Sequence, residues 1–384
     1  EPLREFYLAY YTKQQNWRRL EQFLTDPTKG GMEDAVEVKR MLGRLVAQSD
    51  QPDRAIPFWQ GVHTAEPGDQ EAESALADLY RAVGKWHAMV DLLKARAKSL
   101  GDDDPEARIA LYREMIAIYK DQLNAPSKVI ATWQAVLEVD SGNMEALDAL
   151  AAEYEGMNRW PDLVKVLQKK IDHTHDDSGK IALHQQIAGI LMARFNNATE
   201  ATKHHQAILD LDETNAESIA VLKEIYESRR DFESLVQITM RELLYEEDEE
   251  ARKAGVLALA RKASEHIRKP PTPIMLWEQV LEDDPSQLEA LSQLEALYER
   301  EKDYDALSVI RLRRVELLED PAERVGILER LGTLYSGKLD RPDDAAEVWK
   351  RLLQEDRTHQ KALTELRKKY TAERDWDQLE WFFR

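Results

Sequence analysis

Apolar residues recur along the chain at the spacing of a helix. In the segment 287–298 they stand at positions 288, 291, 294, 297 and 298, and polar residues fill most of the remaining positions. Steps of three and four residues place these apolar side chains on one face of an α-helix. The pattern predicts amphipathic helices with one buried stripe, since runs of alternating Val, Ile and Thr, typical of strands, are absent.

A longer period organises these helices. Successive tyrosines of one series are separated by 69, 74, 72, 72 and 72 residues: Tyr11, Tyr80, Tyr154, Tyr226, Tyr298 and Tyr370. A second aromatic follows each tyrosine by six residues: Trp17, Trp86, Trp160, Phe232, Tyr304 and Trp376. A third series falls midway between the tyrosines: Trp59, Trp133, His205, Trp277 and Trp349. Each period of about 72 residues therefore holds two helical hairpins of about 36 residues.

Start and stop signals agree with this division. Ser286 with Glu289, and Thr214 with Glu217, have the spacing of a capping box, so we expect helices to begin at Ser286 and Thr214. Breakers separate the apolar stripes, among them Pro67, Pro105, Pro285, Pro321, Pro342 and the segments 101–104 and 141–143. The connecting loops are predicted to be short.

One hairpin carries a family signature. Leu328, Leu331, Gly332 and Tyr335, followed by Ala345 and Trp349, resemble the signature of tetratricopeptide repeats. The resemblance implies that a small residue lets paired helices approach, as at Gly332 and Ala151, that a large aromatic fills the space between hairpins, and that Pro67 and Pro285 end second helices. The residues expected to form this repeat core are Tyr80, Trp133, Tyr154, Tyr226, Trp277, Tyr298, Gly332, Tyr335 and Trp349.

Three positions depart from the signature, so the repeats are divergent. Glu295 stands at a close-approach position, His205 replaces an aromatic, and Pro273 replaces the small residue four positions before Trp277. The phasing gives eleven hairpins, which begin near residues 2, 33, 70, 105, 143, 178, 215, 249, 287, 322 and 359. We therefore expect residues 1–384 to form a single all-α, right-handed α-solenoid, part of a longer polypeptide.

Charge restricts the classes of partner. The chain has 53 Lys and Arg against 73 Asp and Glu, a net charge of −20, which disfavours nucleic acid and favours a basic or neutral partner. No run approaches the ~18 apolar residues of a membrane span, so the chain is expected to be soluble without inserting into a membrane. It has no cysteine, which excludes disulfides and thiolate sites but leaves the compartment open, cytoplasmic or bacterial periplasmic.

The sequence offers no recognisable catalytic constellation, and we expect neither an enzyme nor a cofactor. No nucleophile with a neighbouring base, Gly-rich phosphate loop or carboxylate pair stands in a known context. The densest histidine group shares no evident face for a metal ion: His173, His175, His184, His204 and His205. The tryptophans keep the register of the repeat, which favours core packing over stacking on sugars or bases.

Acidic residues recur at outward positions of the first helix of several hairpins. The resemblance implies that these helices line the concave, ligand-binding surface, so an acidic partner-binding set is predicted there: Asp78, Glu145, Asp148, Glu217, Glu224 and Glu289. Glu71, Glu145, Glu217 and Glu289 also suit a first turn, where the helix dipole favours carboxylates. Asp148 and Glu224 lie deeper in their helices and escape that alternative.

Two functions remain open. The first is a protein-binding scaffold that holds a partner segment, expected to be basic, on the acidic concave surface. The second is an architectural spacer that contacts partners only through its ends. An end-to-end contact through Trp381, Phe382 and Phe383 would serve either function, and packing of these residues on the preceding hairpin is the alternative.

Overall fold

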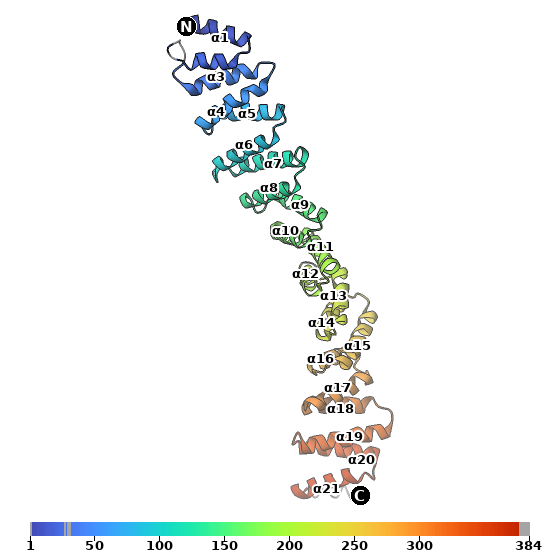
Figure 1. The fold of residues 1–384 in the computed structure, drawn as a ribbon. Helices are drawn as coiled ribbons and strands as arrows, with labels where there is room; N and C mark the ends of the chain where they lie inside the picture. Colours follow the sequence, from blue (N-terminus) through green and yellow to red (C-terminus); the bar gives the residue numbers. More distant parts are fainter. Residues whose placement is uncertain (1, 27, 29–31, 376–384) are drawn as a thin grey trace. The chain divides into compact units, whose positions relative to one another are not determined.

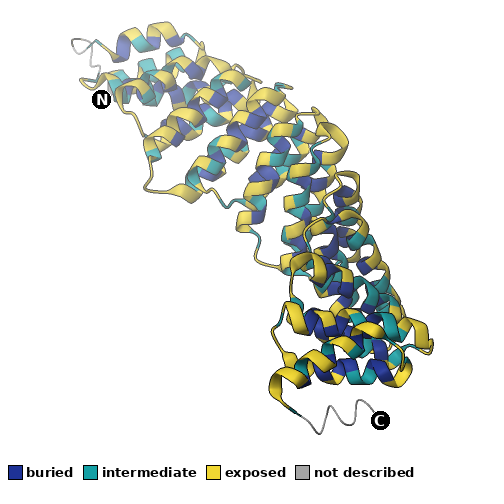
Figure 2. Ribbon diagram, turned by 90° about the horizontal axis from the view of Figure 1, so that it is seen from below, coloured by how far each residue is buried: buried dark blue, intermediate teal, exposed yellow. Residues whose placement is uncertain are grey.

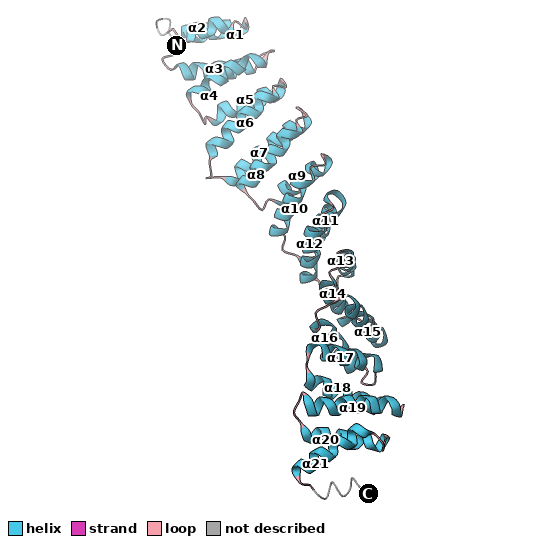
Figure 3. Ribbon diagram, turned by 60° about the horizontal axis from the view of Figure 1, so that its bottom comes forward, coloured by secondary structure: helices cyan, strands magenta, loops and turns pink. Residues whose placement is uncertain are grey.

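The computed structural model describes residues 2–26, 28 and 32–375. Over these residues the chain is built from 21 α-helices and a short 3₁₀ turn, and no strand occurs (Figure 3). Helices that follow one another in sequence pack in pairs, which confirms the predicted all-α solenoid of tandem hairpins. The second helix expected for the eleventh hairpin, with Trp381, Phe382 and Phe383, lies outside the described residues.

The chain divides into two compact units, residues 1–196 and 197–384. The boundary lies inside the hairpin predicted from residue 178, between its two helices. A single solenoid over residues 1–384 therefore stays a prediction, and each unit is described by itself.

The first unit contains five complete hairpins and one further helix (Figure 1). Its helices are α1 (Pro2–Lys13), α2 (Trp17–Leu24), α3 (Ala35–Ala47), α4 (Ile56–Ala65), α5 (Gln70–Ala82), α6 (Trp86–Leu100), α7 (Pro105–Asp121), α8 (Pro126–Val139), α9 (Met144–Gly156), α10 (Trp160–His173) and α11 (Asp177–Phe195). The 3₁₀ turn (Pro52–Ala55) precedes α4.

The second unit begins with a single helix and continues with four hairpins and the first helix of another. Its helices are α12 (Ala198–Leu211), α13 (Ala216–Ser228), α14 (Phe232–Leu244), α15 (Glu249–His266), α16 (Pro271–Asp283), α17 (Leu288–Glu301), α18 (Tyr304–Leu317), α19 (Pro321–Gly337), α20 (Pro342–Glu355) and α21 (Gln360–Glu373).

The two predicted capping boxes are wrong by one residue. Helix α13 is capped by Asn215, whose side chain accepts a hydrogen bond from the backbone N–H of Ser218, and α17 is preceded by Gln287. Thr214 instead donates its hydroxyl to Asp212, and Ser286 donates to Asp284. In each turn an aspartate two residues earlier holds the hydroxyl, which is then not available to cap the helix.

A recurring turn explains why an aromatic follows each repeat tyrosine by six residues. The tyrosine carbonyl accepts a hydrogen bond from the backbone N–H five residues later, as between Tyr298 and Asp303 at 3.0 Å. The residue before that N–H has a positive φ, as at Gly84, Asn158, Arg230 and Lys302. This is the Schellman end of a helix, and the second helix starts directly after it.

The repeat aromatics are buried. Figure 2 shows buried residues in dark blue along the faces of the helices. The exposed fraction is at most 8% for each aromatic residue assigned to the repeat core: Tyr80, Trp133, Tyr154, Tyr226, Trp277, Tyr298, Tyr335 and Trp349. Gly332 lies directly against Trp349, because a Cβ atom there would approach Cε2 of the indole to 2.5 Å. Gly43 and Trp59 repeat this contact in the first unit, at 2.6 Å.

A hydrogen bond joins successive hairpins at each repeat tyrosine of the interior. The residue after the buried aromatic of the second helix reaches the phenol oxygen 20 residues later: Gln60 binds Tyr80 at 2.9 Å, Gln134 binds Tyr154 at 2.9 Å, and Gln206 binds Tyr226 at 3.0 Å. In the next period the tyrosine hydroxyl donates to a carboxylate, between Tyr298 and Glu278. These bonds satisfy the polar end of an otherwise buried ring.

Two of the three departures from the signature are absorbed by packing. His205 is 6% exposed, and its Nδ1 lies 3.1 Å from Oγ of Ser218 on the next helix. Burial lowers the pKa of His205, so the ring stays neutral in the core. Pro273 is buried in the first turn of α16, where the missing N–H costs no intrahelical bond.

Candidate functional site

In the first unit, the predicted acidic residues already hold cations of the same chain. Asp78 lies 3.1 Å from Arg81 on the same helix, and Asp148 on α9 lies 2.5 Å from Nζ of Lys170 on α10. Glu145 is 2.5 Å from Arg113, which belongs to the first helix of the preceding hairpin. These carboxylates remain about half exposed or more, but their charges are balanced locally.

In the second unit, one of the predicted acidic residues forms an ion pair between helices and two are exposed. Glu289 on α17 lies 2.5 Å from Arg261 on α15, and the hydrogen bond from Arg261 lowers the pKa of Glu289. Glu217 and Glu224 are both exposed on α13. A partner-binding role for the six acidic residues stays a prediction, and part of the set forms ion pairs between first helices of neighbouring hairpins.

The first-helix position occupied by Glu289 carries the opposite charge one period later, towards the end of the second unit. Lys361 on α21 stands 72 residues after Glu289 and pairs with Glu329 on α19 at 3.1 Å. Within hairpins, Lys223 pairs with Glu242 at 2.6 Å, whereas 72 residues later Glu295 pairs with Arg314 at 2.7 Å. At these two pairs the register is kept and the polarity is inverted, whereas the pair of Arg341 and Asp305 keeps the polarity of Lys269 and Glu233, 72 residues earlier.

Glu295, the third departure from the signature, is the centre of a buried ionic cluster. It is 5% exposed and accepts hydrogen bonds from Nε of Arg311 at 2.8 Å and from Arg314 at 2.7 Å. Arg330 on α19 lies 3.6 Å away. Burial raises the pKa of Glu295, but the two hydrogen bonds outweigh it, so the pKa lies below its ordinary value and the carboxyl group is ionised.

A groove of about 900 Å³ lies directly beside this cluster. We call it the α17–α21 groove, because α17, α18, α19 and the start of α21 line it. Its lining residues are Glu299, Lys302, Tyr304, Leu307, Arg311, Gly326, Glu329, Arg330, Thr333, Leu334, Gly337, Lys338 and Lys361.

Cations predominate in the lining of the groove. Five side chains are positive and two are negative, which gives 5 − 2 = +3 in a chain whose net charge is −20. The positive residues are Lys302, Arg311, Arg330, Lys338 and Lys361, and the negative ones are Glu299 and Glu329. The groove is therefore a local region of positive charge on an acidic protein.

The groove also offers apolar contact. Leu307 and Leu334 are buried residues of its lining, and Tyr304 is partly exposed at its side. Nζ of Lys338 lies 5.8 Å from the centre of the Tyr304 ring, a cation–π distance. An occupant can therefore meet charged and apolar groups in the same groove.

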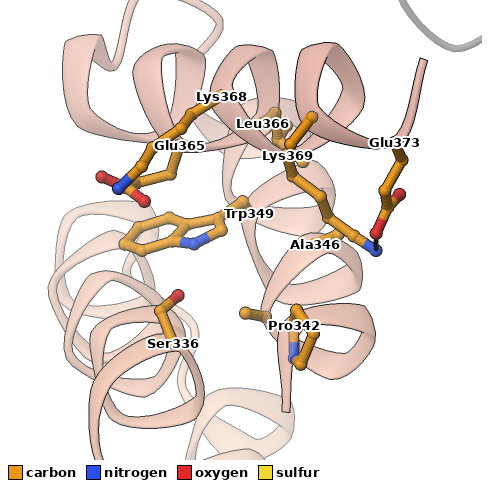
Figure 4. A pocket seen from close by; sticks show the side chains of 11 residues that line it. Ser336, Pro342, Ala346, Trp349, Glu365, Leu366, Lys368, Lys369 and Glu373 are labelled. Atoms are coloured by element: carbon orange, nitrogen blue, oxygen red, sulfur yellow. Dashed lines mark ion pairs between the residues drawn. The ribbon is translucent and has the colours of Figure 1, made fainter. Parts of the chain in front are cut away.

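A second cavity, of about 260 Å³, lies between α19, α20 and α21 (Figure 4). One wall is the Trp349 indole, and Ala345, Ala346 and Leu366 supply much of its apolar lining. At its mouth Lys369 forms ion pairs with Asp343 at 2.5 Å and Glu373 at 3.1 Å. Two of the four charged lining residues, Lys369 and Glu373, therefore pair with each other.

We searched the described part of the chain for metal sites and for membrane-spanning helices. Across residues 2–26, 28 and 32–375, His, Cys, Asp and Glu form no group of three or more that could hold a metal ion. The same residues include no helix that is both long and apolar enough to span a bilayer. Burial lowers the pKa of His184 as it does that of His205.

Sequence reasoning missed the α17–α21 groove. Its cations lie at different register positions of four helices, so no recurring basic set marks them in the sequence. One signal was present, since Lys361 breaks the series of Glu71, Glu145, Glu217 and Glu289. A comparison of charge sign at equivalent positions would have pointed to this end of the chain.

Comparisons with known proteins support the family resemblance. No family model matches the chain. The TPR repeat-containing protein YpiA of Bacillus subtilis (strain 168) is 23% identical over 275 residues, which cover 71% of this chain and 61% of that protein. The chain thus spans about three fifths of the length of this relative.

Two solved structures that match the chain have low sequence identity to it. The TPR domain of P58(IPK) is 14% identical, with 87% of this chain and 97% of that chain covered and a TM-score of 0.23. Yeast Tom70 is 12% identical, with 98% and 89% covered and a TM-score of 0.24. The tandem helical hairpins of this chain, its recurring aromatic positions and its similarity to YpiA make the chain similar to proteins of tetratricopeptide repeats.

Proposed function

We propose that this protein is a non-catalytic scaffold for protein–protein interaction, and that the α17–α21 groove holds a segment of a partner. The groove itself carries the proposal. It combines about 900 Å³ of space with charged and apolar lining groups from four helices. Tetratricopeptide-repeat folds serve as interaction scaffolds, but the fold alone names no partner.

The dimensions of the groove suit a stretch of polypeptide. Its lining on α19 runs from Gly326 to Lys338, which at ~1.5 Å per helical residue is about 18 Å. An extended chain advances ~3.3–3.6 Å per residue, so about five residues of a partner would lie along α19.

A second candidate keeps the acidic residues as the binding site for a basic segment. Exposed Glu224 on α13 supports it in the second unit, as does Asp148 in the first unit, whose side chain is 59% exposed although Lys170 pairs with it. The paired state of Glu145 and Glu289 weakens it, because a basic partner would have to displace arginines already in place. The architectural spacer predicts that neither surface matters.

Site-specific photocrosslinking tests the proposal. The crosslinker p-benzoylphenylalanine is introduced at Gly326, where a side chain meets no atom within 4 Å, and in a control at Gly156 on α9, which is equally open. Both full-length variants are irradiated in extract of the native source, and adducts are identified by mass spectrometry. The purified candidate partner is then titrated against the full chain.

We expect one protein to crosslink at position 326 and not at 156, and to bind the purified chain. Adducts at neither position, or the same adducts at both, would contradict a specific partner site in the groove. A partner that instead loses affinity on charge reversal at Asp148 or Glu224 would establish the second candidate.

A further inference from the structure

Resting on the proposed function, we infer that the occupant of the α17–α21 groove is an acidic segment of a partner protein, bound through its carboxylates. The inference reverses the basic partner expected from the net charge of −20. It depends on three observations: the surplus of cations in the lining, the three arginines that share the carboxylate of Glu295, and the apolar surface beside them.

The cation surplus is built into the fold. Arg311 is 3% exposed, yet it lines the groove. Its position is set by Glu295 at 2.8 Å and by Glu299 at 3.5 Å. A charged group held in this way is pre-organised, so little side-chain entropy is lost when a ligand arrives.

The acceptors around Arg311 are shared. The carboxylate of Glu295 lies within 4 Å of Arg311, Arg314 and Arg330, and each guanidinium carries five N–H donors. Arg330 is the most open of the three, with 61% of its side chain exposed, and it lines the groove. A carboxylate from outside would accept charge-assisted hydrogen bonds from the exposed guanidinium of Arg330.

Three lysines extend the positive field along the groove. Lys302 lies at the end of α17, Lys338 at the end of α19, and Lys361 at the start of α21. Lys361 has its charge balanced by Glu329 at 3.1 Å, whereas Lys338 lies over the Tyr304 ring. The lysines would steer a negatively charged segment towards the arginines.

An acidic polypeptide fits this lining better than a nucleic acid does. Glu299 and Glu329 would face a continuous phosphate backbone at close range, and the whole chain repels polyanions. A polypeptide can place carboxylates against the cations and an apolar side chain against the partly exposed Tyr304. We therefore expect acidic and apolar residues to be interspersed in the bound segment.

The test uses the full chain and three fluorescein-labelled probes: a peptide that alternates Glu with Leu, its Lys analogue, and an oligouridylate. Binding is measured by fluorescence anisotropy at low and at high salt. The groove variant is Lys338→Glu, which removes a cation that lies over a ring. The control is Lys165→Glu in the first unit, the same change in net charge at a side chain that is 77% exposed. Circular dichroism verifies that both variants are folded.

We expect the Glu-containing peptide to bind the chain, and its affinity to fall at high salt. The Lys338→Glu variant should raise the Kd of this peptide about tenfold, which corresponds to about 1.4 kcal/mol in binding free energy. The Lys165→Glu control should change little. A further variant, Arg330→Gln, should weaken binding without placing a new carboxylate beside Glu295.

Preference for the Lys peptide or for oligouridylate would overturn the inference, as would failure of the Glu peptide to bind or an equal loss in the control. The scaffold proposal is tested separately, by the crosslinking experiment. If a protein crosslinks at Gly326 but the acidic peptide does not bind, the groove is a partner site and only its chemistry has been misjudged.

Discussion

Two neighbouring hairpins of the second unit fill the same position in different ways. In α19 and α20, Gly332 has no side chain and the Trp349 indole lies against its backbone. In α17 and α18, the equivalent first-helix position is Glu295, and Arg311 approaches it from the second helix. The first hairpin closes with an aromatic ring over a glycine, and the second closes with a buried ion pair.

The difference shows how a repeat can acquire a polar site without losing its fold. A buried ion pair costs desolvation energy that an apolar contact does not, and it is stable only while both partners are present. In exchange, it places an ordered arginine at the edge of a groove. We expect the first hairpin to lose stability when side-chain size increases, and the second to lose stability when a charge is removed.

The largest effect is expected from Glu295→Leu. It leaves Arg311, 3% exposed, without its main partner, and breaking a buried pair in this way costs about 3–5 kcal/mol in the free energy of unfolding. Urea denaturation followed by circular dichroism measures the change. The double variant Glu295→Leu, Arg311→Met should recover most of the loss, and a double variant as unstable as the single one would show that the pair is not the cause.

The next effect is expected from Gly332→Ala. The added Cβ would lie 2.5 Å from the Trp349 ring, so the ring must move, at a cost of about 1–3 kcal/mol. Gly326→Ala on the same helix is the control. A Cβ atom at that site would meet no neighbouring side chain or other helix within 4 Å, so alanine should stabilise by about 0.5–1 kcal/mol through helix propensity. Equal effects of the two substitutions would refute the close contact.

Lowering the pH should have a smaller effect on the free energy of unfolding. Because the folded pKa of Glu295 lies below the ordinary value of 4.5, its contribution to stability is present above that pH and is lost as the pH falls through the folded pKa. The difference in unfolding free energy between the wild type and Glu295→Gln should therefore shrink as the pH drops below about 4.5. A difference that stays constant from neutral to acid pH would argue against an ionised Glu295.

The smallest effect is expected at the exposed pair of Arg261 and Glu289. Arg261→Glu should weaken the contact between α15 and α17 only slightly, because exposed pairs are screened by water and salt. Adding Glu289→Arg restores opposite charges in the polarity that Glu329 and Lys361 already have. A thermal melt of the single and double variants would show whether the polarity of these pairs affects stability, which we expect it does not.

The sequence predicts the fold well because the repeat is carried by buried side chains. Tyr298, Trp277 and Gly332 mark their positions by size and spacing, and these properties are visible in one dimension. The helix starts at Asn215 and Gln287 were misplaced by one residue, since Thr214 and Ser286 bond to aspartates of the turn.

The site was harder to predict because charge pairing depends on three-dimensional neighbours. Glu145 and Glu289 look like free carboxylates in the sequence, and the arginines that hold them lie 32 and 28 residues earlier. The oddity of Glu295 was evident, but its partners Arg311 and Arg330 come from two other helices. Net charge was misleading for the same reason, since the positive groove gathers residues from 299 to 361.

The turns that follow the repeat tyrosines offer a practical route to a more heat-resistant protein. Gly84 occupies the left-handed position in one of them, but Asn158, Arg230 and Arg374 adopt the same positive φ in others. A non-glycine residue in this region carries strain of about 1–3 kcal/mol, less for asparagine. Glycine at positions 230 and 374 would release it without altering a buried atom. Lys302 shares the conformation but lines the groove, so an engineer would leave it unchanged.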